Sequence, residues 1–183
     1  MGTRTEAIKN KVIIDTNFYE YWNQCRMLNY AAQENYQLLL ESMNQPFFVE
    51  NELRQMGYFN ATLLLRAVAI ENLIKSRVLF QMKEEGNLPK DILLKEIIEK
   101  YWTRKISHNP IKLCKKYNID LNQEETDLIQ NHLDHMDWAG RFPFPVKINN
   151  IKSEQVLGGN QSKEMDKLIS RFANEMKLDL NSL

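Results

Sequence analysis

The sequence predicts an all-α fold, a single bundle of about five to six mostly antiparallel helices. Apolar residues recur at spacings of three and four over long stretches. Short segments with Gly, Pro and Asn separate these stretches, as turns between helices do. Residues 58–85 are apolar on nearly every face, as in a helix that other helices cover on all sides. No internal repeat or linker divides the chain, so we expect residues 1–183 to form one domain.

The first helix is expected to begin near Asn17, because the side chain of Asp15 or Thr16 can cap its free amide groups. Pro46 ends it. The helical stripe between these points consists of Tyr21, Trp22, Cys25, Leu28, Ala32, Tyr36, Leu39 and Met43.

The central helix is expected over residues 58–85. A short segment, residues 49–55, precedes it, and Gly57 marks the break between the two. Gly86 then ends the central helix in the usual pattern of a glycine followed shortly by a proline.

Further helices complete the bundle. Pro110 suits the first turn of a short helix because its missing amide hydrogen would have no partner there. Asn122 is suited to cap the helix that follows, which Gly140 ends. Residues 146–160 are expected to form a loop, which can include a short strand at 146–151. The expected ranges of these helices are 92–102, 110–117, 123–139 and 162–177.

Composition excludes some classes of function. The formal net charge is zero and the sequence pI is about 6.8, so no overall basic field indicates nucleic-acid or membrane binding. The sequence has no apolar run long enough to cross a membrane and no apolar core of a secretory signal at its start. Cys25 and Cys114 are far apart and form no metal-type spacing, which favours a reduced, cytoplasmic setting.

Two charged residues interrupt the apolar face of the central helix. Glu71 and Lys75 lie one turn apart, close enough to pair. An acid inside an apolar stripe is costly unless something pairs with it. Lys75 is the local partner, and Arg141 is a distant candidate partner for Glu71.

His108 directly precedes the short helix that Pro110 opens, in the stretch KISHNPIKL. Arg104, Lys105 and Lys112 lie nearby, so the imidazole would suit a phosphate or another anion. The alternative is that His108 is a capping or turn residue.

Arg141 lies in AGRFPFP, on a turn that two prolines stiffen. Its guanidinium could hold a phosphate or the carboxylate of Glu71 with two hydrogen bonds. The alternative is a purely structural clamp.

The remaining candidate residues give weaker evidence for a functional site. His132 and His135 lie three apart on one helix, but no third ligand is evident, so we expect no metal site and assign them to a solvated helix face. Cys114 is expected in the core. The sequence contains no glycine-rich phosphate loop, nucleophile elbow or zinc-binding helix motif, so we expect no cofactor.

Three separated stretches resemble a known family. ATLLLRAVAIENLIKS with Glu71 and Lys75, SHNPIKL with His108, and AGRFPFP with Arg141 follow the order and rough spacing seen in HEPN-domain proteins. The resemblance covers about residues 15–145, leaving a loop and a C-terminal helix in 146–183.

The resemblance implies a compact helical bundle, often homodimeric, that serves RNA metabolism, toxin–antitoxin pairs or antiviral defence. Many members are metal-independent ribonucleases with an Arg-x4-6-His motif. Here only three residues separate Arg104 from His108, and His132 and His135 precede Arg141. We therefore expect a non-catalytic module.

Its expected ligand is a nucleotide, RNA or a protein partner, bound through Glu71, Lys75, His108 and Arg141. One alternative is a divergent metal-independent endoribonuclease in which His108 is the general acid or base and Arg104 or Arg141 stabilises phosphate charge. Another is an oligomeric scaffold in which these residues form an internal tie.

Overall fold

The regular structure of the chain is helical throughout the part that a computed structural model describes, which confirms the all-α prediction. The described residues are 18–46, 48–88, 92, 96–103, 106–138 and 159–178, with backbone only for 134–138 and 159–160. The elements are α2 (Phe18–Met43), α3 (Val49–Glu84), η1 (Ile97–Trp102), α5 (Pro110–Lys116), α6 (Gln123–Trp138) and α7 (Gly159–Glu175).

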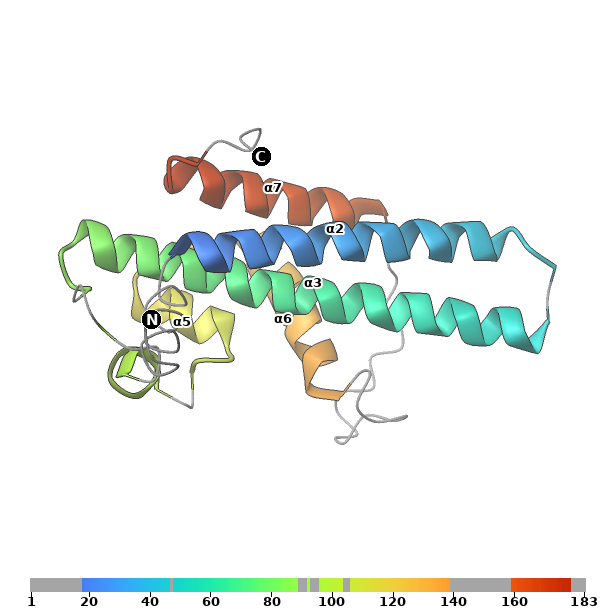
Figure 1. Cartoon of the computed structure of the whole chain (residues 1–183), viewed down its shortest axis with the longest axis horizontal. Coiled ribbons are helices and arrows are strands. Elements are labelled where there is room, and N and C mark those ends of the chain that lie inside the picture. The colour runs from blue at the N-terminus through green and yellow to red at the C-terminus, as the bar shows by residue number, and fades with distance from the viewer. Residues whose placement is uncertain are drawn as a thin grey trace, which may run out of the picture.

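Helix α3 lies at the centre of the bundle. It runs antiparallel to the shorter helix α2, extends beyond the start of α2, and also contacts α5, α6 and α7 (Figure 1). The side chains from Leu63 to Met82 supply much of the core, and Leu73, Ile74 and Val78 have no exposed surface. A central buried helix is therefore confirmed.

The start of α3 corrects the prediction. The helix begins at Val49 rather than near residue 58 and continues through Gly57 without a break. A glycine inside a helix costs only about 1 kcal/mol relative to alanine. Each residue of an already nucleated helix adds a hydrogen bond, so good helix formers on both sides offset that cost.

The predicted helix over residues 92–102 is also corrected. Ile92 is not helical, and Ile97–Trp102 form a π-helix rather than an α-helix. Ile97 and Trp102 are both buried although they lie five residues apart. The wider π-helical turn, with its hydrogen bonds between residues five apart, brings two such side chains to one face.

Two predicted helix starts are confirmed in detail. The Oδ1 atom of Asn109 accepts from the amide of Lys112, 2.9 Å away, with Pro110 in the first turn of α5. Asn122 and Glu125 form a reciprocal capping box at α6, with distances of 2.8 and 3.0 Å.

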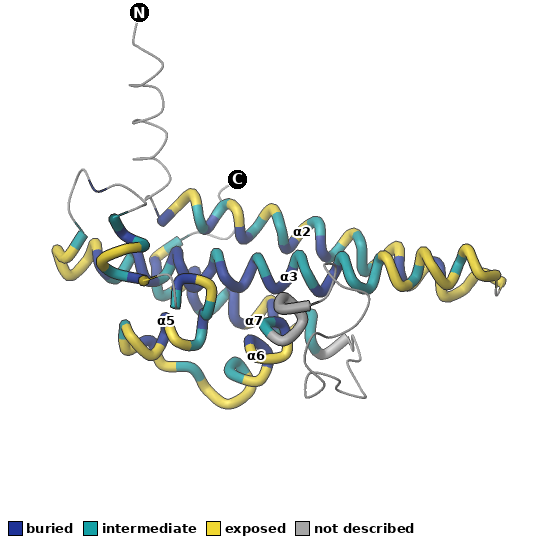
Figure 2. Tube along the Cα trace, turned by 90° about the horizontal axis from the view of Figure 1, so that it is seen from below, coloured by how far each residue is buried: buried dark blue, intermediate teal, exposed yellow. Residues whose placement is uncertain are grey.

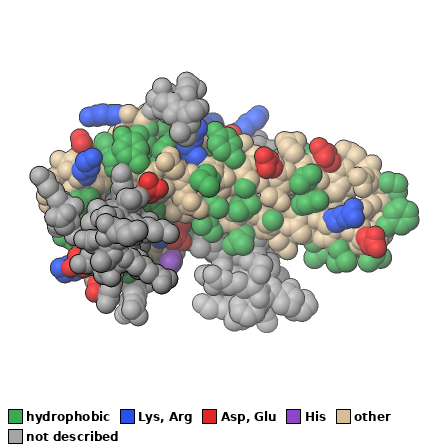
Figure 3. Space-filling model, in the orientation of Figure 1, with side chains coloured by type: hydrophobic (Ala, Val, Ile, Leu, Met, Phe, Trp, Pro, Cys, Tyr) green, Lys and Arg blue, Asp and Glu red, His purple; other side chains and the backbone are tan. Residues whose placement is uncertain are grey.

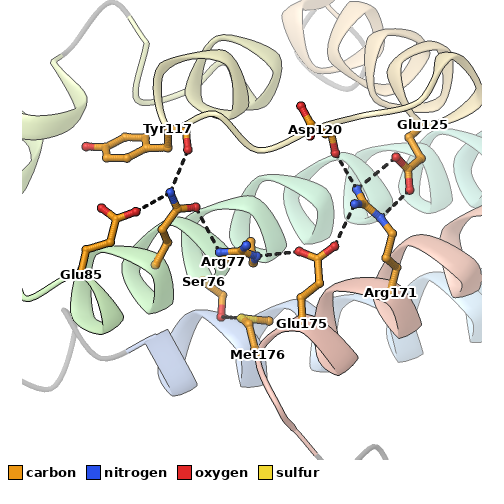
Figure 4. Close-up of polar contacts among 10 residues, drawn as sticks. Ser76, Arg77, Glu85, Tyr117, Asp120, Glu125, Arg171, Glu175 and Met176 are labelled. Atoms are coloured by element: carbon orange, nitrogen blue, oxygen red, sulfur yellow. Dashed lines mark hydrogen bonds and ion pairs between the residues drawn. The ribbon is translucent and has the colours of Figure 1, made fainter.

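A chain of polar contacts fixes α7 to the bundle (Figure 4). Arg171 donates from Nη1 to Glu175 at 2.9 Å, and its Nε lies 2.7 Å from the Glu125 carboxylate on α6. Arg77 of α3 reaches the other carboxylate oxygen of Glu175, also at 2.7 Å. Glu175 therefore bridges two arginines, one from α3 and one from α7.

A buried arginine ties three helices together. Arg66 of α3 has only 1% of its surface exposed, and its guanidinium lies over the Tyr36 ring of α2 and donates to Ser162 of α7. Burial lowers the pKa of this guanidinium, an effect that the charges of Tyr36 and Asp166 oppose.

Some predictions fall outside the described residues. These are the cap at Asp15 or Thr16, the end of α6 at Gly140, and the loop and strand within 146–158. Gly159 and Asn160, expected in the loop, already belong to α7, so this end of the loop prediction is wrong. Within the described part, no helix has the length and apolar character that a membrane crossing requires.

Candidate functional site

The charged pair of the central helix is buried. Glu71 and Lys75 have 7% and 8% of their surfaces exposed, and the Lys75 ammonium group contacts Glu71 Oε1. Both charged groups are thereby shielded from most of the solvent. Each needs the opposite charge of the other to offset its desolvation cost.

Two aromatic rings cover the ammonium group of Lys75. Its Nζ atom lies 5.5 Å from the centroid of the Trp102 ring and 6.0 Å from that of Tyr21. The two rings meet edge to face at 5.9 Å. This cation–π environment holds Lys75 in place from the sides that Glu71 does not occupy.

His108 is the exposed member of this cluster. Its side chain is 75% exposed, yet its Nδ1 atom lies 3.1 Å from Glu71 Oε1. One carboxylate oxygen therefore contacts both the buried Lys75 and the exposed His108.

The turn that presents His108 follows directly from η1. The amide groups of Ile106 and Ser107 donate to the carbonyl of Thr103, at 3.2 and 3.0 Å. Thr103 has a φ of 55° and a ψ of 149°, which is unfavourable for a β-branched residue. Backbone strain of this kind is found mostly where the surrounding structure must hold a particular geometry.

Carboxylate contact at Nδ1 determines what His108 can do chemically. A carboxylate accepts a hydrogen bond, so it favours the tautomer with the proton on Nδ1 and leaves Nε2 as the second reactive atom of the ring. When the ring is doubly protonated, Nε2 becomes a donor, and the cluster gains a net positive charge because Glu71 and Lys75 already balance.

The structure thus brings together three of the four residues of the cluster predicted from the sequence. Glu71, Lys75 and His108 come together, whereas Arg141 and the second candidate arginine, Arg104, lie outside the described residues. The contacts that unite the three are all with one carboxylate, that of Glu71.

Sequence reasoning missed two further members of the site. The sequence places Trp102 only at the end of the helix expected over 92–102, and Tyr21 only in the apolar stripe of the first helix. Both rings contact Lys75, and the buried Nε1 of Trp102 has no hydrogen-bond partner among the described residues. The available signal was the lysine itself, since a lysine within an apolar helix needs aromatic or acidic neighbours.

The assignment of His132 to a solvated face is wrong. Its surface is only 1% exposed, and Nδ1 lies 2.8 Å from the carbonyl of Leu128. A histidine inside the core can satisfy a ring nitrogen in this way without leaving its own helix. The side chain of His135 lies outside the described residues.

Cys114 lies in the core as expected, and Cys25 is also buried. Burial raises the pKa of both thiols to about 12, which keeps them protonated and unreactive near neutral pH. Neither cysteine belongs to the cluster.

Comparison with protein-family models, curated proteins and solved structures finds no match to this chain. The resemblance to HEPN-domain proteins therefore rests on the three sequence stretches.

Proposed function

We propose that this chain is a HEPN-like helical module that binds RNA or a nucleotide through His108. The observation that supports this proposal is the position of the imidazole. It is exposed to solvent but anchored at Nδ1 by the buried carboxylate of Glu71. An exposed ring held in one orientation is suited to meet a ligand, because its ordering cost has already been met within the folded protein.

A phosphate is the ligand group that fits this geometry best. Glu71 occupies Nδ1, so when the ring carries both protons its free Nε2–H would donate a charge-assisted hydrogen bond to a phosphate oxygen. Lys75 neutralises Glu71, so the carboxylate does not repel the anion. The exposed ring can also stack on a base that is not paired in a duplex.

A divergent ribonuclease is the second candidate, and the Glu71–His108 contact is the observation that favours it. A carboxylate behind an imidazole orients the ring and stabilises the charge that forms when it accepts a proton. His108 would then take the proton of a ribose 2′-hydroxyl through Nε2, with Arg104 or Arg141 beside the phosphate. A cytoplasmic role in a toxin–antitoxin pair or in defence would suit either candidate.

The experiment is a titration of fluorescently labelled single-stranded RNA, and separately ATP, with the purified chain in buffer without divalent metal. We expect His108→Ala to weaken binding about tenfold or more, the usual effect of losing one charge-assisted hydrogen bond. Lys163→Ala is the matched control, because it removes an exposed cation from α7, a helix that contributes no residue to the cluster.

Gel analysis of the same mixtures separates the two candidates. RNA that is bound but remains intact supports the binding module. Cleavage that His108→Ala abolishes, with the thermal melt unchanged, supports the ribonuclease. Equal RNA and ATP affinity for the wild type and His108→Ala would contradict both and favour an internal structural tie.

A further inference from the structure

The free end of the α2–α3 hairpin, residues 38–56, carries an unusual share of the exposed apolar surface. Within the described part of the chain, ten large apolar side chains are exposed, and seven of them lie in this hairpin end. Figure 2 shows the hairpin end as largely exposed, and Figure 3 shows apolar side chains gathered there on one face. The seven are Leu38, Leu40, Met43, Phe48, Val49, Leu53 and Met56.

The remaining described helices stop short of the hairpin end. Helix α7 contacts the hairpin at Arg66 of α3, through Ser162 near its own start, and at Gln33 of α2, through Asp166. Beyond these contacts no other helix of the described residues lies beside the two antiparallel helices (Figure 1). A concentration of exposed apolar side chains at one end of a folded protein indicates an interaction site.

We infer that the hairpin end is the surface through which two copies of this chain associate. The seven side chains expose between 39% and 69% of their surfaces. A standard protein interface buries about 800 Å² on each partner, so a dimer here would bury these apolar side chains together with the polar residues beside them. The net charge of zero offers little electrostatic opposition to self-association.

The pattern along α3 fits its own copy in antiparallel orientation. Val49, Leu53 and Met56 follow one another at spacings of four and three, which places them in one row on the helix. A two-fold axis near Leu53 sets Val49 of one copy opposite Met56 of the other, and the rows can interdigitate as in other antiparallel helix pairs.

Exposed charges beside this row complement one another under the same symmetry. Glu50 and Arg54 both flank the row on one side, as positions four apart on a helix do. The two-fold axis brings Glu50 of one copy toward Arg54 of the other, and the same pair forms a second time. The association is thereby specified in orientation as well as driven by apolar burial.

This inference is independent of the proposed ligand site. Leu53 and Glu71 are eighteen positions apart on one continuous helix, which separates them by about 27 Å along its axis. Association at the hairpin end and binding at His108 can therefore be tested separately.

The test is sedimentation velocity of the full chain over a dilution series from about 1 μM upward, the range in which dimers of ordinary affinity dissociate. We expect a monomer–dimer equilibrium. Met56→Lys should raise the dissociation constant at least about tenfold, as for other buried apolar interface residues. Met27→Lys is the matched control, since Met27 is similarly exposed, at 64% against 56%, but lies outside the hairpin end.

A charge exchange tests the orientation. Glu50→Lys and Arg54→Glu should each weaken the dimer, and the double variant should restore it. A monomeric wild type throughout the series would overturn the inference. So would a dimer that Met27→Lys weakens as much as Met56→Lys does. If the double variant is no stronger than either single one, the antiparallel arrangement is wrong.

Discussion

The Nδ1 atom of His108 lies 3.1 Å from Oε1 of Glu71, although 37 positions separate the two residues in the sequence. This contact joins the turn before α5 to the central helix. The contact also links an exposed ring to a buried ion pair. A substitution of Lys75 inside the bundle should therefore alter the environment of the His108 ring on its surface.

The buried pair gives the first prediction. Lys75→Met should lower the free energy of unfolding by about 3 kcal/mol or more, because it leaves the carboxylate of Glu71 buried without its cation. Glu71→Leu should cost a similar amount. The double variant should recover most of the loss, since apolar residues of similar volume often replace a buried pair at little cost. Urea unfolding of all three variants provides the measurement, and additive losses would contradict the coupling.

The bridge at Glu175 gives the second prediction. Arg171→Met should destabilise the fold by about 1 to 2 kcal/mol and increase hydrogen exchange within α7, because it removes contacts to both Glu125 and Glu175. Lys177→Met is the contrasting control. Its side chain is 79% exposed and lies 4.0 Å from Glu84, so we expect no measurable change. Unchanged exchange in α7 of Arg171→Met would show that the network does not hold that helix.

The continuity of α3 gives the third prediction. Gly57→Ala should stabilise the protein by about 0.5 to 1 kcal/mol, because the backbone there is helical and an added Cβ meets no atom within 4 Å. Gly86→Ala should instead destabilise it by about 1 kcal/mol, since Gly86 has a φ of +70°. Thermal melts distinguish the two, and a destabilised Gly57→Ala protein would indicate that the helix breaks at this position.

The buried thiols give the fourth prediction. Burial raises the pKa values of Cys25 and Cys114 from 9.0 to about 12, so the unfolded chain loses these protons at lower pH than the folded one. Their contribution to stability is complete below pH 9.0 and is lost as the pH rises toward about 12. Denaturant unfolding should show a shallower decline over this range in a Cys25→Ala, Cys114→Ala variant than in the wild type. An identical decline in both proteins would be evidence against this linkage.

The sequence predicts the helices of this bundle well where local chemistry defines them. Asn109 with Pro110, and Asn122 with Glu125, satisfy free amide groups within one turn, so their effect does not depend on the rest of the chain. Gly57 misled the prediction because the local cost of a glycine is small against the hydrogen bonding of a long packed helix.

The candidate site was predictable only in part. Glu71 and Lys75 lie one turn apart, so their pairing follows from helical geometry. The approach of His108 depends on the π-helical turn of η1 and the backbone of Thr103, which no spacing rule encodes. For His132 a usable signal existed, because it lies four residues after Leu128 and three after Ile129, both buried.

The orientation of His108 is the central claim, and nuclear magnetic resonance of the imidazole nitrogens measures it most directly. The chain has three histidines, so a His108→Ala spectrum assigns the signals. We predict that the neutral form of the ring carries its proton on Nδ1, that Glu71→Leu loses this preference, and that the Nε2 signal shifts when RNA is added. A neutral ring with its proton on Nε2 instead of Nδ1, or an Nε2 signal that saturating RNA leaves unchanged, would contradict the account.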